Sequence, residues 1–390
     1  MFVSSVPLKL PQPVSTRGPL SLVRFTAAQA ARALDHWEQL ERRIGSTAIA
    51  NSNLWTNTWL RHYGDLISHE FLLAESGGQP RGICLLTRGA GESWGALRLR
   101  SLHVGTAGEP NAESVCVEYN RLLVEDGFRA DFCRLLVAHV EREADWDQFQ
   151  FDGFAPGEVD VLLSSFPAVD VRRRTSRYFD LQSVRESGTD ILSALGSSTR
   201  SNLRRRLRGY GELTIDWVDS LIDAEEVFSE LVSLHQARWT AVGKPGVFAS
   251  RRFHDFQLEL MVRGLDDRRV VLFRVGQGRQ TIGCLFLLVD CNRLLDYLSG
   301  FAAFDQHASP GLVVHYLCML EALRRGYDAY DFLVGEHQHK RNLSNAQGEL
   351  IWATWRRDRL KFRMADVARR VKRTVRYWRS SEAPQTSDQD

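Results

Sequence analysis

The stretch "RVVLFRVGQGRQTIGCLFLLVDCNRLLDYLSGFA" (269–302) decides the fold. Two runs rich in valine, leucine, isoleucine and phenylalanine flank "GQGR" (276–279), and glycines between two such runs are typical of a β-hairpin turn. A further run of the same kind, 293–301, begins within the short polar stretch "CNR". The sequence therefore predicts a hairpin followed by one more strand.

A helix and another strand follow. The stretch "SPGLVVHYLCMLEALRRG" (309–326) has the end signals of a helix, because Ser309 suits the N-cap, Pro310 suits the first helical position and Gly326 follows the last turn. "YDAYDFLVG" (327–335) has strand character. This alternation predicts an α/β fold with a mixed sheet. We also expect a strand over 213–218, helices over 223–239 and 251–262, and a last strand over 349–356.

The first half of the chain repeats this order of elements, although the two halves are not similar in sequence. The recurrence predicts two copies of one α/β unit joined near residues 181–210. The alternative is that any α/β chain can be divided in this way. In the first half we expect strands over 21–26, 97–105, 146–153 and 169–181, a hairpin over 70–89, and helices over 27–43, 56–66 and 129–143.

The composition is typical of a soluble globular protein, with 44% apolar and 25% charged residues and a net charge of +2. The basic excess is local, because residues 356–390 carry 11 Lys and Arg against 5 Asp and Glu, whereas the rest of the chain is net negative. Charge therefore gives little support to nucleic-acid binding by the body of the protein.

The ends of the chain and the cysteines indicate a cytoplasmic protein. No run of about 18 apolar residues suggests a membrane span. The proline-rich residues 1–19 lack the apolar core of a signal peptide and are expected to be a disordered lead. The six cysteines are scattered, which favours reduced, buried thiols over disulfides or zinc ligands.

Two stretches have the chemistry of an anion site. The start of the helix at Ser309 presents backbone N–H groups and a positive dipole end. Here Gln306-x-x-Ser309-x-Gly311, with Leu312 next to it, resembles the pyrophosphate loop Q/R-x-x-G-x-G/A of GNAT acyltransferases. The second stretch is a basic helix near 197–208, which is either a clamp for anionic groups or a solvated helix face.

Four stretches carry a wider resemblance: "STRSNLRRRLR" (198–208), "LHQARWTAVGKPGVFAS" (234–250), "HASPGLVVHYL" (307–317) and "YDFLVGEHQHKRNLS" (330–344). The chain resembles the CelD-like group of GNAT acetyltransferases, which is associated with cellulose-biosynthesis operons and related to the tandem-GNAT FemAB peptidyltransferases. The resemblance implies two tandem GNAT domains and acetyl-CoA, or another acyl-CoA, as co-substrate. The first-half stretch "VEDGFRADF" (124–132) has no glycine pattern, so the nucleotide site is expected in the second half only.

The resemblance also implies where the reaction takes place. In GNAT folds the fourth and fifth strands splay apart, and a backbone N–H between them meets the carbonyl oxygen of the acyl group. Here those strands are 293–301 and 328–333, which makes Ser299 and Gly300 candidate contacts of acyl-CoA.

The last motif of the family usually reads like D-F-L-x-G-D-x-x-Y-K, and here His339 stands where the family has tyrosine. In many GNAT enzymes a tyrosine near this position protonates the leaving CoA thiolate, so the resemblance makes His339 a candidate acid. Asp331 is either a base with a pKa raised by burial or a structural carboxylate. Glu336 is a candidate base or acceptor-orienting group at the end of the strand.

The other candidates concern the acceptor. Lys340 is expected to contact the acceptor or a phosphate, or else to be a surface lysine. His235, Arg238 and Trp239 end a helix that resembles the acceptor-side segment of the family, and the alternative is plain helix packing. The spacing of Glu336, His337 and His339 fits no established zinc pattern, so no metal is expected.

The end of the chain predicts an amphipathic helix over 357–379, followed by a disordered tail, 380–390. Its apolar stripe either docks on its own domain or lies on an anionic membrane surface, which would make the protein membrane-peripheral. The stripe consists of Leu360, Met364, Val367, Val371, Val375 and Trp378.

The sequence thus predicts a tandem GNAT protein with domains over 20–182 and 183–356. It is expected to transfer an acyl group, which the resemblance implies is acetyl, from acyl-CoA to an amine or hydroxyl of a small molecule, polysaccharide or cell-envelope precursor. One alternative is a FemAB-like aminoacyltransferase, the only case in which tRNA would be a partner. The other is a non-enzymatic accessory protein of polysaccharide biosynthesis.

Overall fold

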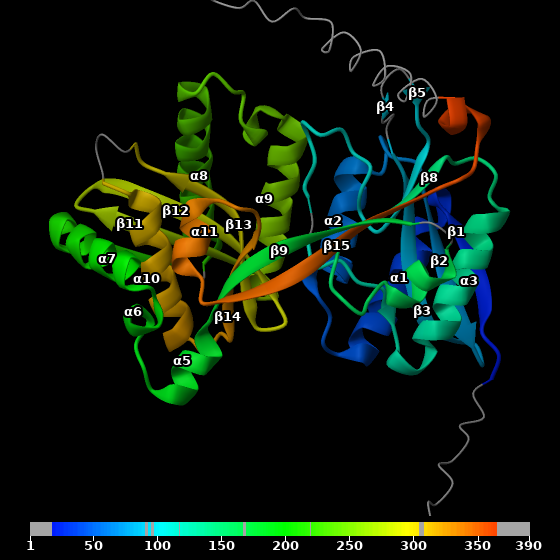
Figure 1. The fold of residues 1–390 in the computed structure, drawn as a ribbon, viewed down its shortest axis with the longest axis horizontal. Coiled ribbons are helices and arrows are strands. Elements are labelled where there is room, and N and C mark those ends of the chain that lie inside the picture. Colours follow the sequence, from blue (N-terminus) through cyan, green and yellow to red (C-terminus); the bar gives the residue numbers. More distant parts are fainter. Residues whose placement is uncertain are drawn as a thin grey trace, which may run out of the picture.

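The computed structural model of the chain describes residues 18–89, 93–94, 97–116, 118–166, 169–218, 220–303 and 308–364. The first half of the fold, on the right in Figure 1, contains the expected hairpin and helices. Its elements are β1 (Ser21–Thr26), η1 (Ala27–Gln29), α1 (Ala30–Ile44), η2 (Ile49–Asn51), α2 (Asn53–Tyr63), β2 (His69–Ser76), β3 (Gln79–Arg88), β4 (Ser93–Trp94), β5 (Leu97–Arg98), β6 (Ser101–Val104), β7 (Leu123–Val124), η3 (Asp126–Phe128), α3 (Arg129–Arg142), β8 (Gln148–Phe154), α4 (Asp160–Ser165) and β9 (Asp170–Asp180).

The second half follows the order that its sequence predicts. Cys291 and Asn292, both with positive φ, form the tight turn after the hairpin, and Gly326 has a φ of +87° just past the end of α10. The elements are α5 (Leu181–Ser187), α6 (Ile191–Ala194), α7 (Ser197–Tyr210), β10 (Thr214–Val218), α8 (Leu221–Ala241), η4 (Val247–Ala249), α9 (Arg251–Asp266), β11 (Val270–Gln277), β12 (Gln280–Asp290), β13 (Arg293–Phe301), α10 (Pro310–Arg324), β14 (Ala329–Val334), α11 (Gln338–Leu343) and β15 (Ala346–Arg356).

The two halves have the same sheet topology, which confirms the predicted tandem arrangement in a mixed α/β fold. In each half three antiparallel pairings are followed by one parallel pairing, β6 with β8 and β13 with β14. One more antiparallel strand then closes each half. All of these strands belong to one 13-stranded sheet with the order β1-β2-β3-β6-β8-β15-β9-β14-β13-β12-β11-β10, from which β7 branches at β3.

The two halves exchange their last strands. β9 ends the first half along the chain but pairs with β14 of the second half, whereas β15 ends the second half along the chain but pairs with β8 of the first. β9 and β15 also pair with each other and run side by side across the middle of the molecule (Figure 1). The boundary between 20–182 and 183–356 stays a prediction, and the exchange means that no cut of the chain separates two complete sheets.

A shared hydrophobic core joins the halves on one face of the sheet. Helices α1 and α2 of the first half and α8 and α9 of the second contribute to one buried cluster. Within it, the ring of Trp55 lies 5.3 Å from that of Phe256 and 6.0 Å from that of Tyr297. The opposite face has separate cores, one under α3 and one under α10. Because aromatic burial crosses the halves, the two units are held together by more than the exchanged strands.

Among the described residues, no helix is long and apolar enough to cross a lipid bilayer. Four of the six cysteines are buried, whereas Cys116 and Cys291 are exposed. Residues 357–364 of the predicted C-terminal helix lie within the described range. Of these, 357–359 are not helical, whereas 360–364 are helical and expose Leu360 and Met364. Docking of 357–379 on the protein or on a membrane therefore stays a prediction.

Candidate active site

The strands β13 and β14 pair over only three residues and then part. Their parallel pairing joins Arg293–Leu295 to Ala329–Asp331. Beyond it, the register of β14 against β9 shifts between Asp331 and Val334, and Leu333 has a φ of +61°. On β13, Tyr297 is an extra residue, because Leu287 faces Asp296 and Phe286 faces Leu298 on the neighbouring strand. We call the point where the strands part, residues 296–299 and 332–334, the fork.

Asp296 lies at the fork with an unpartnered carboxylate oxygen. Its side chain is 9% exposed, and Oδ2 lies 3.8 Å from Nε2 of His315. Oδ1 is buried and takes no hydrogen bond from any residue that the structure describes. Burial raises the pKa of Asp296 to about 6, against the opposing effect of the charge on Lys340. A buried carboxylate with a spare oxygen and a pKa near neutrality is suited to accept a proton.

Three imidazole rings stack outward from Asp296. The ring of His315 in α10 lies parallel to that of His339 at 5.9 Å, and His339 lies at 5.7 Å from His337. Nδ1 of His315 is 2.9 Å from the hydroxyl of Tyr330. Loss of water around the rings lowers the pKa of His315 to about 3 and that of His339 to about 4. The His339 ring is therefore neutral at pH 7, although the side chain reaches the surface.

Lys340 points back into the fork. Its Nζ donates to the carbonyl of Val334 at 2.9 Å and also to those of Phe332 and Leu333. It thus holds the left-handed backbone at Leu333, which a branched side chain disfavours. The predicted contact of Lys340 with an acceptor or phosphate stays a prediction, and these bonds give it a structural task at the end of β14.

Asp331 takes part in a closed hydrogen-bond network. Its carboxylate is fully buried and accepts from the hydroxyl of Tyr119 at 2.6 Å, from Ser176 at 2.8 Å and from the N–H of Leu333 at 2.8 Å, and it pairs with Arg293. Every partner is a donor that stabilises the ionised form. Such contacts are typical of a structural carboxylate. The catalytic role of Asp331 stays a prediction, and the geometry of the network gives it no support.

Glu336 lies outside the fork. Its side chain is 64% exposed and makes long ion pairs, at 3.6 Å with Arg177 and 3.5 Å with Arg341. A role as base stays a prediction. Among the described residues, no group of three or more His, Cys, Asp or Glu side chains is arranged to hold a metal ion.

The helix α8 packs directly on β13 at Ser299 and Gly300. Nδ1 of His235 donates to the carbonyl of Ser299 at 3.1 Å, and Nε2 of the same ring is buried without a described partner. A Cβ added to Gly300 would lie 2.6 Å from the carbonyl oxygen of Leu231, so only glycine lets the helix approach. Close packing of α8 is therefore enough to explain why a glycine stands at position 300. The contact of Gly300 with acyl-CoA stays a prediction.

The end of the same helix borders a mainly apolar cavity. Arg238 is exposed and lines this cavity of about 770 Å³ together with Leu234 of α8 and Phe301 at the end of β13. Trp239 packs on the ring of His235 at 6.0 Å and lies under the ammonium of Lys244. The cavity adjoins the place where the chain leaves β13 for the nucleotide loop, and its size is that of a small-molecule pocket.

The helix α10 starts at the expected residues, with Ser309 at the N-cap and Pro310 at the first helical position, but without a side-chain cap. Ser309 occupies the N-cap position with a left-handed backbone, φ +59°, and its side chain makes no capping bond. Pro310 has no N–H, and Leu312 donates its own to the carbonyl of Ser309 at 3.1 Å. Gly311 packs against the ring of Phe301, and a Cβ added to Gly311 would lie 3.2 Å from the nearest ring carbon. Gln306 lies outside the described residues, so the phosphate contacts of this loop stay a prediction.

The corresponding fork of the first half is filled. There β6 and β8 pair only over Ser101–His103 and Gln148–Gln150. Beyond this pairing Asn120 donates its backbone N–H to the carbonyl of Gly153 at 2.9 Å, and its side chain reaches the carbonyl of Val104. Asn120 thus bridges the parting strands of the first half, and the expectation that only the second half holds a nucleotide stays a prediction.

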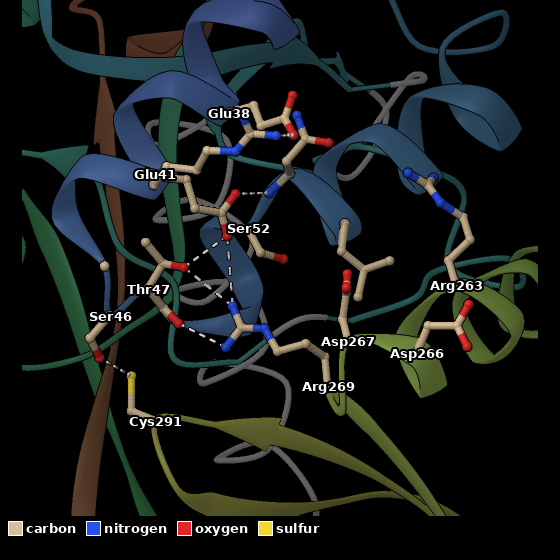
Figure 2. A pocket seen from close by; sticks show the side chains of 14 residues that line it. Glu38, Glu41, Ser46, Thr47, Ser52, Arg263, Asp266, Asp267, Arg269 and Cys291 are labelled. Atoms are coloured by element: carbon tan, nitrogen blue, oxygen red, sulfur yellow. Dashed lines mark hydrogen bonds and ion pairs between the residues drawn. The ribbon is translucent and has the colours of Figure 1, made fainter. Parts of the chain in front are cut away.

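A cavity of about 880 Å³ lies away from both forks (Figure 2). It is lined by the end of α1, the start of α2, the end of α9 and Cys291, which precedes β13. Figure 2 shows that Glu41 is paired within the cavity, where it accepts from Thr47 at 2.8 Å and lies 3.8 Å from Arg269, whereas Asp266 and Asp267 have no marked interaction with another lining residue. None of its lining residues belongs to the fork.

Comparisons with known proteins agree with this geometry. Residues 197–341, which include every element of the second fork, match the family described as "Acetyltransferase (GNAT) domain". The structure of FemX is similar, with a TM-score of 0.52 and 10% sequence identity. The alignment covers 85% of this chain and 96% of the FemX chain. The C-terminal domain of a putative lysylphosphatidylglycerol synthetase from Agrobacterium fabrum is also similar, with a TM-score of 0.52 and 14% identity. That alignment covers 83% of this chain and 92% of the synthetase domain.

A third similar structure is L-PGS from Bacillus licheniformis, with a TM-score of 0.50 and 12% identity. The alignment covers 87% of this chain and 96% of the L-PGS chain. No curated protein matches the sequence. At such identities the solved structures show a shared fold and not a shared substrate. Residues 197–341 match a GNAT domain, and the first half repeats the sheet topology of the second, so the chain has a tandem GNAT fold.

Two residues at the second fork were missed from the sequence. Asp296 carries the same signal as Asp331, a carboxylate inside an apolar strand, but the two cannot be ranked without their partners. Glu118 accepts from the N–H of Val334 at 2.9 Å, although it lies more than 200 positions earlier in the chain. No local pattern in the sequence indicates this second contact.

Proposed function

We propose that this protein transfers an acyl group from acyl-CoA to an amine at the fork of β13 and β14, with Asp296 as the general base. The observation that carries this proposal is the unpartnered Oδ1 of Asp296 where the two strands part. The match of residues 197–341 to an acetyltransferase domain supports acyl transfer as the reaction.

The amine must lose a proton before it can attack the thioester. With a pKa of about 6, Asp296 is ionised at neutral pH and is still basic enough to take that proton. After the attack, the nitrogen gives up a second proton as the C–S bond breaks, and the leaving CoA thiolate receives it. The acceptor thus supplies both protons, one to Asp296 and one to the thiol.

His339 is a poor source of the thiolate proton. A pKa of about 4 leaves very little imidazolium at pH 7, so the ring has almost no acidic proton to give. The position that resembles the family tyrosine therefore serves better as part of the ring stack between His315 and His337. The reaction proposed above needs no separate acid.

The room for the donor supports the same reaction. The apolar cavity of about 770 Å³ between α8 and the end of β13 offers a place for the apolar part of an acyl donor close to the fork. Acetyl as the acyl group, and a polysaccharide or cell-envelope precursor as the acceptor, follow from the CelD-like resemblance and remain parts of the proposal. An aminoacyl-tRNA donor is the rival, since the fold is also that of FemX and a putative lysylphosphatidylglycerol synthetase.

Ligand-dependent stability separates these donors. We expect acetyl-CoA to raise the melting temperature of the full chain, because a ligand at 100 times its Kd adds about 2.7 kcal/mol to the free energy of unfolding. The Asp296→Asn variant should show the same shift, since the base is not needed for donor binding. A shift with aminoacyl-tRNA and none with acetyl-CoA or CoA would overturn the proposal in favour of the rival. No shift with any of them would point to the non-enzymatic alternative.

A further inference from the structure

The segment between β6 and β7, residues 105–122, belongs to the first half but contacts the fork of the second half. Val115 accepts a hydrogen bond through its carbonyl from the hydroxyl of Tyr297, the extra residue on β13. Glu118 accepts from the N–H of Val334 at 2.9 Å. Tyr119 donates to Asp331 at 2.6 Å and receives a hydrogen bond from Arg293 at 3.0 Å. One segment thus reaches both strands of the fork.

The backbone of this segment is held in a conformation that it would not adopt alone. Cys116 and Tyr119 have φ values of +45° and +61°, in the left-handed region that non-glycine residues disfavour. Such conformations persist where surrounding contacts determine them, and they gather at binding and catalytic sites. The bonds of Tyr119 and Val115 on either side therefore fix the position of Glu118.

The carboxylate of Glu118 is only half satisfied. Oε2 accepts from Val334, whereas Oε1 has no hydrogen bond with a described residue and, unlike Oδ1 of Asp296, is not fully buried, because Glu118 is half-buried. Burial raises the pKa of Glu118, and the largest opposing effects are the N–H of Val334 and the charge on Lys340. The charge on Lys340 acts on Asp296 as well. Glu118 and Lys340 both bond to Val334, one to its N–H and the other to its carbonyl, so the carboxylate from the first half and the ammonium from the second meet at the fork.

We propose that Glu118 binds the ammonium group of the acceptor, so that this site takes protonated amines rather than alcohols and is built from both halves of the chain. This inference rests on the proposed acyl transfer at Asp296. A cation beside Glu118 satisfies Oε1 and offsets the cost of burying the carboxylate, whereas a hydroxyl group supplies no charge. Lys340 does not play this part, because its Nζ is bound to three carbonyls and forms no ion pair with a described carboxylate.

The matched pair Glu118→Gln and Glu113→Gln tests this role. Glutamine keeps an oxygen for the N–H of Val334 and removes only the charge. Glu113 lies in the same segment, but its carboxylate is 3.7 Å from Arg252 of α9 and away from the fork. Release of CoA from acetyl-CoA is measured with a panel of primary amines, including glucosamine and lysine amide, and with alcohols of matched size.

We expect Glu118→Gln to raise the KM for the amines at least tenfold while the KM for acetyl-CoA and its stabilising effect stay unchanged. Glu113→Gln should match the wild type in all of these measurements. An unchanged amine KM in Glu118→Gln, or a wild type that prefers the alcohols, would overturn the inference and leave the acyl transfer standing. A wild type that neither binds acetyl-CoA nor releases CoA would overturn both proposals together.

Discussion

Asp296 and Asp331 are carboxylates on neighbouring strands with opposite surroundings. Asp331 is surrounded by four donors, whereas Asp296 has a buried oxygen without a described partner. Burial without donors favours the protonated acid, and burial with donors favours the carboxylate. The same residue type therefore stabilises the fold on β14 and weakens it at neutral pH on β13.

Asp296→Asn should stabilise the protein at neutral pH. The folded pKa of about 6 lies above the unfolded value of 3.8, so the aspartate destabilises the fold as pH rises through this interval. We expect the variant to gain up to about 3 kcal/mol in free energy of unfolding at pH 7.5 and almost nothing at pH 4. Urea unfolding at the two pH values measures the gain. A variant less stable than the wild type at pH 7.5 would show that Asp296 is a structural residue.

Asp331→Asn should have the opposite effect. It leaves the Arg293 guanidinium without its buried partner, a loss that costs about 3 kcal/mol or more. Urea unfolding of this variant at neutral pH should show the loss. Asp328→Asn is the control, because its carboxylate is partly exposed and pairs with Arg185 at the surface. Equal stability of the two variants would contradict the structural role of the Asp331 network.

At the scale of elements, the contact between α8 and β13 positions the site. Gly300 lets the helix approach the strand, and His235 then bonds to the carbonyl of Ser299 beside the fork. The strands and long helices of this half were predictable from apolar periodicity and from capping residues. The packing of α8 on Gly300 could not be predicted, because a glycine beside a binding site and a glycine under a helix look alike in sequence.

Gly300→Ala should push α8 away from β13. The added Cβ would meet the carbonyl oxygen of Leu231 at 2.6 Å and the N–H nitrogen of His235 at 3.2 Å, and backbone atoms have little freedom to move. We expect a loss of about 1–3 kcal/mol in the free energy of unfolding. Gly209→Ala in α7 is the control, since nothing lies within 4 Å of its Cβ and alanine favours a helix. The idea fails if Gly300→Ala is as stable as this control.

At the scale of the whole molecule, the exchange of β9 and β15 joins two repeated units into one sheet. The repeat itself was predictable, because each unit has the same order of local elements. The exchange of strands was not predictable, because the pairing partners of β9 and β15 lie far away in the sequence. The sequence of neither strand indicates which strand it pairs with. For the same reason Glu118 and Tyr119 could not be assigned to the second fork in advance.

Splitting the chain after Gly188 tests the exchange. The fragment 1–188 would lack β15 beside β8, and the fragment 189–390 would lack β9 beside β14. Each would also expose its share of the common core. We expect neither fragment to unfold cooperatively alone, and we expect the two to assemble when expressed together. Cooperative unfolding of either fragment by itself, followed by circular dichroism, would show that the halves are independent domains.

The central claim is that Asp296 accepts the proton of the acceptor amine, and the pH dependence of acyl transfer tests it most directly. With acetyl-CoA and an amine from the panel, kcat/KM of the wild type should fall at acid pH with an apparent pKa near 6, the value to which burial raises Asp296. Asp296→Asn should lose this acid limb and fall at least about 10²-fold in kcat/KM at pH 7.5. A variant that keeps both the acid limb and the activity would contradict the account.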